Sequence, residues 1–173
     1  MHIAVVTVSD RASRGEYEDL SGALIEDWLK KTITSQYELT RRVIPDGFES
    51  VRDNLIDLCD QERLDLVLTT GGTGPAPRDE TPEAMRAVLV KELLGFGELM
   101  RRVSLDQTPT AILSRQTAGT RGHTLIINLP GNPAAIRICL DTIFSAVPYC
   151  LDLIGAGHIE TDPTRVRSYR PAR

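Results

Sequence analysis

A glycine-rich turn with charged neighbours is the part of this sequence best suited to carry out chemistry. An apolar β run, Leu66–Thr70, is followed directly by Gly71, Gly72, Thr73 and Gly74. Arg78 and Asp79 come next, before a helix start at Thr81. A glycine turn between a strand and a helix start lets backbone N–H groups approach a phosphate without interference from a Cβ atom. Arginine and aspartate supply the charges that a phosphate and its metal ion require, so the pattern predicts an anion site.

Polar residues also follow the other strands that the sequence predicts. The set comprises Ser9, Asp10, Arg11, Asp46, Ser114, Arg115, Asn128, Pro130, Gly131 and Asn132. Ligands of open α/β sheets bind outside the carboxyl ends of the strands, so we expect these clusters to share one rim. Taken singly, Asp10 and Asp46 fit ordinary helix caps or turn formers better than a binding site. Ser114 and Arg115 are equally an ordinary strand end.

Several familiar catalytic motifs are absent from the sequence. No Gly-Lys-Ser/Thr follows the glycine turn, which excludes a Walker A loop. The run from Gly72 to Pro77 breaks the spacing of a dinucleotide fingerprint. There is no GxSxG elbow, no zinc-binding histidine spacing and no paired cysteine and histidine. We interpret the three histidines as structural or exposed.

The elements that must position these residues alternate regularly. Apolar runs predict strands at 3–8, 37–44, 65–70, 111–114 and 123–129. Helical periodicity predicts helices from Asp19 or Ser21, over 51–59, 82–92 and 95–103, and from 136 to 147, where Pro148 should bend or interrupt the last one. We expect a short polar loop at 9–15. This alternation indicates an α/β fold with a doubly wound, mostly parallel sheet.

Length and composition limit the class of protein. A chain of 173 residues suits one domain, which we place at residues 1–157. Residues 158–173 form a basic tail, which we expect to be a loosely held surface segment. A net charge of −4 and an aromatic content of 5% argue against a nucleic-acid partner.

The cysteines and the N-terminal run predict the compartment. The three cysteines have no CxxC spacing and fit buried apolar positions of a reducing compartment. The chain passes from Met1 into an apolar strand, with no basic leader and no long hydrophobic segment. We therefore expect no membrane association and a cytoplasmic protein.

Several motifs occur in fixed order between residues 3 and 155. They are Val8-Ser-Asp-Arg-Ala-Ser13, Ile44-Pro-Asp46, Thr69-Thr-Gly-Gly-Thr-Gly74, Arg78-Asp79, Thr81-Pro-Glu-Ala84, Gly95-Phe-Gly-Glu98, Ala111-Ile-Leu-Ser-Arg115, Gly119-Thr-Arg-Gly122 and Thr124-Leu-Ile-Ile-Asn-Leu-Pro-Gly-Asn-Pro133. Together they resemble the MogA family of molybdopterin adenylyltransferases, which is related to the MoaB proteins and to the G domains of eukaryotic molybdenum-cofactor insertion proteins. The segment between Leu140 and Ile143 is shorter than in some bacterial members.

The resemblance implies a three-layer α/β/α domain, usually a homotrimer, that binds molybdopterin and ATP. Such enzymes transfer AMP to the terminal phosphate of molybdopterin, release pyrophosphate and use Mg²⁺. It places the family's catalytic, metal-binding aspartates at Asp46 and Asp79, and the nucleotide loop at 71–74. It also places Ser114 and Arg115 on the pterin side, and Asn128, Pro130 and Gly131 at the pocket floor. A downstream molybdenum-insertion protein is a possible partner.

The residues suit this chemistry without reference to a family. A phosphate monoester has its second pKa near 6, so it is already an anion at neutral pH and needs no histidine base. Asp46 and Asp79, at the ends of two strands expected to be adjacent, are suited to binding Mg²⁺. Arg11, Arg78 or Arg115 would face the departing pyrophosphate. Two alternatives remain: a MoaB-like molybdopterin-binding or carrier module without turnover, and a nucleotide-dependent enzyme acting on another small phosphate.

Overall fold

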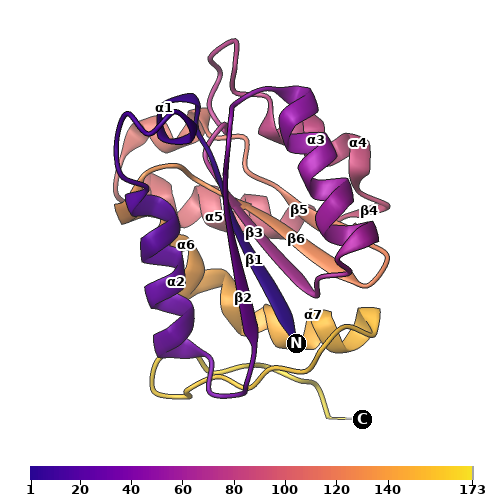
Figure 1. Ribbon diagram of the computed structural model, residues 1–173. Helices are drawn as coiled ribbons and strands as arrows, with labels where there is room; N and C mark the ends of the chain where they lie inside the picture. Colours follow the sequence, from indigo (N-terminus) through magenta and orange to yellow (C-terminus); the bar gives the residue numbers. More distant parts are fainter. Residues whose placement is uncertain (173) are drawn as a thin grey trace.

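The computed structural model describes residues 1–172. The fold is built on one mixed six-stranded sheet (Figure 1). Four strands run parallel: β1 (His2–Val8), β2 (Glu38–Ile44), β3 (Leu66–Thr70) and β6 (Thr124–Leu129). The antiparallel β5 (Ala118–Arg121) and the two-residue β4 (Lys91–Glu92) extend the β6 edge. The strand order is β2-β1-β3-β6-β5-β4. The predicted doubly wound, mostly parallel sheet is confirmed.

Helices cover both faces of the sheet. One face carries α2 (Leu20–Thr32), α5 (Leu94–Leu105), α6 (Pro133–Ile143) and α7 (Val147–Ile154), and the other carries α3 (Phe48–Ile56) and α4 (Thr81–Val88). Alternate residues of β1 serve the two cores: Ile3 and Val5 join the first, while Val6 and Val8 join the second. A strand with both faces covered must be apolar throughout, which explains the unbroken run at the start of the sequence. The three-layer architecture is therefore as expected.

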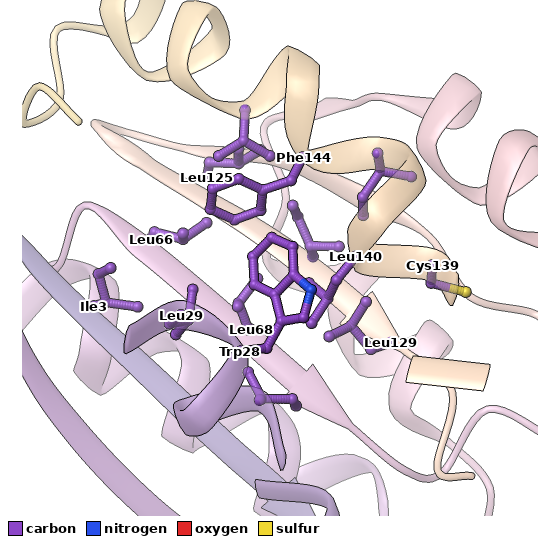
Figure 2. Close-up of a cluster of buried hydrophobic side chains, with 14 of the residues drawn as sticks. Ile3, Trp28, Leu29, Leu66, Leu68, Leu125, Leu129, Cys139, Leu140 and Phe144 are labelled. Carbon is purple, nitrogen blue, oxygen red and sulfur yellow. The ribbon is translucent and has the colours of Figure 1, made fainter. Parts of the chain in front are cut away.

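The larger core lies between the sheet and the α2/α6 pair. Figure 2 shows Trp28 of α2 and Phe144 between Leu66, Leu125 and Leu140. The two aromatic rings meet edge to face with their centroids 4.8 Å apart, a favoured arrangement for aromatic pairs. The Trp28 Nε1–H also donates a 2.6 Å hydrogen bond to Asp141, so the indole is both packed and satisfied.

Four local predictions were wrong. The segment predicted as a strand at 111–114 belongs to a 3-10 helix, η2 (Pro109–Leu113). Only Ala111 of this helix is buried, so its other apolar side chains do not join the core of the sheet. Strand β5, which pairs with β6 through a tight turn at Gly122, is absent from the predicted elements. Helix α4 ends at Val88 rather than continuing to 92, since 91–92 pair with β5. The expected loop at 9–15 contains one helical turn, α1 (Asp10–Ser13).

The helices at the end of the domain follow one another almost without a break. A 3-10 turn, η3 (Phe144–Ala146), separates α6 from α7, and Pro148 lies in the first turn of α7. A π turn, η1 (Asp57–Gln61), similarly extends α3. The 22-residue stretch Pro133–Ile154 is long and apolar enough to span a membrane. Its core-facing side chains, among them Phe144, pack against the sheet, and this burial explains why the stretch is apolar.

The segment after residue 157 is not the loosely held tail that the sequence analysis predicted. Ile159 is fully buried and Val166 is 5% exposed, and both belong to the larger core. The Thr34 N–H donates to the Glu160 carbonyl at 2.9 Å. In Figure 1 this segment crosses the molecule at the end where the N-terminus lies. The four arginines give this segment its polar character, but widely spaced apolar residues anchor it.

The C-terminal segment should stabilise the fold in a pH-dependent manner. Hydrogen bonds to Glu160 and then Asp152 raise the pKa of His158 above its ordinary value. A raised pKa means that the stabilisation is fully present below the unfolded-state pKa and is lost as the pH rises through the folded-state pKa. We expect His158→Gln to lower the melting temperature at pH 5.5 but to have little effect at pH 8.5. Because this cluster is solvent-exposed, the effect should stay below about 1 kcal/mol. Calorimetry showing equal losses at both pH values would contradict this.

Candidate functional site

The candidate site lies at the carboxyl ends of the parallel strands, where the winding of the sheet reverses. The chain passes from β1 to β2 on one side of β1 and then to β3 on its other side. Loops that leave β1 and β3 therefore diverge, and such a switch point forms a crevice. The Ser9–Arg11 turn follows β1, Asp46 follows β2 and the glycine loop 71–74 follows β3 at this end of the sheet, as the sequence predicts. Ser114 and Arg115 instead follow a 3-10 helix, and Asn128 lies within β6.

Glycines allow the loops of this rim to approach one another closely. Gly71 has φ +100°, and a Cβ atom there would lie 2.3 Å from the Val8 carbonyl oxygen at the end of β1. Gly131, in the loop after β6, lies against Gly71 in turn. The glycine loop thus packs against the end of β1 because Gly71 carries no side chain, and the loop after β6 lies in ordinary contact with Gly71.

The glycine loop leads directly into helix α4. Gly72 has φ +62°, and a Cβ there would lie 2.2 Å from the Thr81 Oγ1 atom. The Thr81 N–H donates to the Gly72 carbonyl at 3.2 Å. Thr81 is fully buried, and its Oγ1 has no hydrogen-bond partner within the described residues. Thr81 therefore supports the loop from below rather than facing the open rim.

Arg115 clamps the glycine loop instead of facing an open phosphate site. Its Nε and Nη2 donate to the Gly74 carbonyl at 3.1 and 2.9 Å, and the guanidinium also donates to the Asp79 carbonyl and to Glu83. The Arg115 N–H donates to the Thr73 carbonyl at 2.9 Å. These contacts do not support the expectation that Arg115 faces the pyrophosphate. Its contribution is to hold the shape of the loop.

Asp10, Asp46 and Arg78 join the ends of β1, β2 and β3 in one network. The Asp10 N–H donates to Asp46 Oδ2 at 2.7 Å, and the Asp46 N–H donates back to Asp10 Oδ1 at 3.2 Å. Arg78 donates to both carboxylate oxygens of Asp10, at 2.6 and 2.9 Å, and to the Asp46 carbonyl at 2.6 Å. Bidentate pairing of this kind fixes orientation as well as charge.

The order of the strands corrects one detail of the sequence analysis. Asp46 and Asp79 do not follow adjacent strands, because β1 lies between β2 and β3. Asp10, at the end of β1, is the carboxylate between them. Asp79 accepts a hydrogen bond from the Ala76 N–H at 3.1 Å through Oδ2. Its Oδ1, like that of Asp46, has no hydrogen-bond partner among residues 1–172.

The electrostatics of this network suit a bound cation. Burial raises the pKa of Asp46, and the negative charges of Asp10 and Asp79 raise it further against a backbone hydrogen bond that lowers it. Arg78 lowers the pKa of Asp10. In the described residues no cluster of three or more His, Cys, Asp or Glu side chains is arranged to hold a metal ion. Mg²⁺ needs only one or two carboxylates when substrate phosphate and water complete its shell, so Asp46 and Asp79 fit it.

Two cavities of different character are lined by some of the predicted site residues. One, of about 440 Å³, is lined by residues that include Asp46, Arg78 and Glu80. The other, of about 230 Å³, is lined by residues that include Thr73, Gly74 and Ser114. Pro130, Gly131 and Asn132 also line the second cavity. The first cavity is therefore charged and the second neutral, and Asp10 and Asp79 line neither.

The remaining candidates occupy supporting positions. Ser9 caps α1, and its Oγ lies 3.3 Å from the Tyr17 hydroxyl. Arg11 is exposed and lies over the Tyr17 ring, 5.0 Å from its centroid. Asn128 is fully buried and donates to Thr69 on the neighbouring strand at 3.0 Å, so it lies beneath the rim.

Sequence reasoning missed part of the neutral cavity. Gln116 and Ser104 line it, as do Thr108 and Thr110 near the start of η2. Gln116 directly follows the predicted Ser114-Arg115 pair. Its polar amide is the sequence feature that could have identified it as a site residue. Ser104, Thr108 and Thr110 carry no such signal, because they fall outside the predicted strand ends.

Comparison with known proteins gives consistent matches over the chain. Residues 4–149 match the family described as "Probable molybdopterin binding domain". The molybdopterin adenylyltransferase of Helicobacter pylori is 50% identical over 171 residues, covering 99% of this chain and 97% of the relative. That of Escherichia coli is 44% identical, covering 99% and 94%. The crystal structure of the molybdopterin biosynthesis enzyme MoaB from Thermus thermophilus has a TM-score of 0.82 and 41% identity, covering 92% of this chain and 99% of that one.

The packing of the loops predicts a different cost for two glycine substitutions. Gly71 and Gly122 both have positive φ, but only Gly71 has a backbone oxygen where its Cβ would lie. Gly122→Ala should show the conformational cost alone, on the order of 1 kcal/mol. Gly71→Ala should cost about 1–3 kcal/mol more because the loop must move away from Val8. Urea denaturation measures the difference, and equal losses would show that the close approach carries no constraint.

Proposed function

The chain belongs to the molybdopterin-binding domain family that includes the molybdopterin adenylyltransferases, and on that premise we propose how its rim transfers AMP to molybdopterin. The donor in this proposal is ATP. The terminal phosphate oxygen of molybdopterin attacks the α-phosphorus, the bond from that phosphorus to the bridging oxygen breaks, and pyrophosphate leaves. The observation that carries the proposal is the carboxylate pair beside the glycine loop at the switch point.

The protein's own groups supply positioning and charge. The backbone N–H groups of residues 72–74 suit nucleotide phosphates, since Gly72 and Gly74 carry no side chain that would keep a phosphate away from the backbone. The Gly74 and Asp79 carbonyls are occupied by Arg115, which keeps those oxygens turned away from the anion. Arg78 and the exposed Arg11 are the guanidinium groups left for the departing pyrophosphate. Arg78 would exchange part of its contact with Asp10 for phosphate oxygens.

Asp46 and Asp79 are the residues that would hold Mg²⁺. When bound, the ion offsets the repulsion between two anionic reactants and stabilises the charge that develops on the leaving group. The unpaired Oδ1 atoms of both carboxylates and the raised pKa of Asp46 support this assignment. No general base is required, because the attacking phosphate is already ionised.

A molybdopterin-binding or carrier module without turnover is the competing proposal. The phosphate-binding loop alone would serve binding, whereas a pair of carboxylates beside it serves a metal-dependent reaction. Incubating the protein with molybdopterin, ATP labelled in the α-phosphate and Mg²⁺ tests the two. Formation of adenylylated molybdopterin supports the enzyme, and retention of bound molybdopterin without labelled product supports the carrier.

We further propose a homotrimeric, cytoplasmic protein that passes its product to a molybdenum-insertion protein. Exposed apolar side chains of α5 and η2, such as Leu94, Leu99 and Ile112, would be covered by neighbouring copies. The three unpaired cysteines suit a reducing compartment. Sedimentation equilibrium should give three times the mass of one chain, and a monomer at micromolar concentration would contradict this assembly.

Replacing one metal-binding carboxylate should separate catalysis from binding. We expect Asp79→Asn to lower adenylyl transfer on the order of a hundredfold or more, since one preorganised electrostatic partner is lost. Molybdopterin binding should change far less, and Asp46→Asn should behave alike. Asp53→Asn is the matched control, because that carboxylate pairs with Arg52 on the exposed side of α3. Equal losses of transfer and binding in Asp79→Asn would count against a metal-ligand role.

A further inference from the structure

The neutral cavity beside the glycine loop differs chemically from its charged neighbour. Its lining consists of hydroxyl, amide, apolar and backbone groups, with no charged side chain among the described residues. The charged cavity contains Asp46, Glu49, Arg78 and Glu80. A neutral lining does not offset the charge of a phosphate, whereas it suits an uncharged heterocycle that forms hydrogen bonds. The pterin half of molybdopterin is such a heterocycle.

Gln116, one of the residues that line this neutral cavity, has a side-chain oxygen without a partner. Gln116 is 2% exposed, and its Nε2 donates to the Cys139 Sγ at 3.7 Å. The Oε1 atom is buried and accepts no hydrogen bond from any residue between 1 and 172. Leaving a buried amide oxygen unsatisfied is unfavourable, and native proteins rarely do so without a reason. A donor on a ligand in the cavity would supply that reason.

Helix α5 fixes the position of Gln116 from behind. A Cβ at Gly97 would lie 2.4 Å from the Gln116 carbonyl oxygen, so the helix approaches this residue as closely as a glycine permits. The Arg101 Nη1 donates to the same carbonyl at 2.8 Å. These two contacts fix the backbone of Gln116, and the bond from its Nε2 to Cys139 Sγ orients the amide, as selective recognition requires.

We propose that Gln116 is a specificity-determining residue, whose Oε1 accepts a hydrogen bond from an N–H group of the pterin ring. The pyrimidine half of a pterin carries two such donors, a ring N–H at N3 and an exocyclic amino group at C2. The ring lies in the neutral cavity, and its phosphate extends toward residues 72–74. This inference rests on the proposed function in taking molybdopterin as the ligand.

The test measures ring recognition without turnover. The probes are 6-hydroxymethylpterin, its N3-methyl derivative and its 2-dimethylamino derivative, titrated by pterin fluorescence in the absence of ATP. The wild-type protein should bind the unmodified pterin about tenfold more tightly than at least one derivative, because that derivative lacks the donor. In Gln116→Met, which keeps the length of the side chain and removes the amide, this preference should disappear. The KM for molybdopterin should rise about tenfold while that for ATP stays within twofold.

Asn54→Leu is the matched control. Asn54 lies on α3, and its Oδ1 is also buried without a partner in the described chain, but it does not line the cavity. This variant should leave pterin binding unchanged. The inference is overturned if the wild-type protein fails to bind 6-hydroxymethylpterin, binds all three probes equally, or if Gln116→Met keeps the wild-type preference. Equal binding together with adenylylated product refutes this inference alone, and discrimination without product refutes the transfer reaction alone.

Discussion

The close approach of three loops at the carboxyl ends of the sheet is the constraint on which the site depends. Gly71 lies where any side chain would meet the Val8 carbonyl, and Gly131 lies against Gly71 from the β6 side. This contact brings the end of β1 next to the glycine loop, and Arg78 then reaches across to Asp10. If the loops were farther apart, the network of Asp10, Asp46 and Arg78 would not form.

Charge is unevenly distributed around this contact. Asp10, Asp46 and Asp79 are close enough for their charges to interact, with Arg78 as a partial counterion, and the mutual repulsion contributes to the raised pKa of Asp46. The cavity lined by Thr73 and Gly74 is neutral and has hydroxyl and amide groups in its lining. These two environments match a substrate with an anionic end and an uncharged ring, because a charged group is costly to bury in a neutral lining and an uncharged ring is not. Arg115 holds the glycine loop in place by bonding the Gly74 carbonyl.

The peripheral elements act on the site through the core. Helix α5 sets the position of Gln116 through Gly97 and Arg101, and Trp28 ties α2 to α6 beneath the rim. The C-terminal segment closes the opposite end of the same core with Ile159 and Val166. Changes far from the rim are therefore transmitted to it by packing, since a core of native density does not deform freely.

The sequence by itself determined the α/β class, the parallel strands and the glycine loop, because apolar periodicity and glycine spacing are local properties. It also identified Asp46, Asp79 and Arg78 as rim residues, since strand ends are local too. Only the tertiary structure decided that β1 separates β2 from β3, that Arg115 faces the loop, and that Gln116 lines a cavity. It likewise decided that 109–113 is a 3-10 helix and that the last segment is anchored. These features depend on which distant residues meet, and that is set by packing between layers rather than by any pattern along the chain.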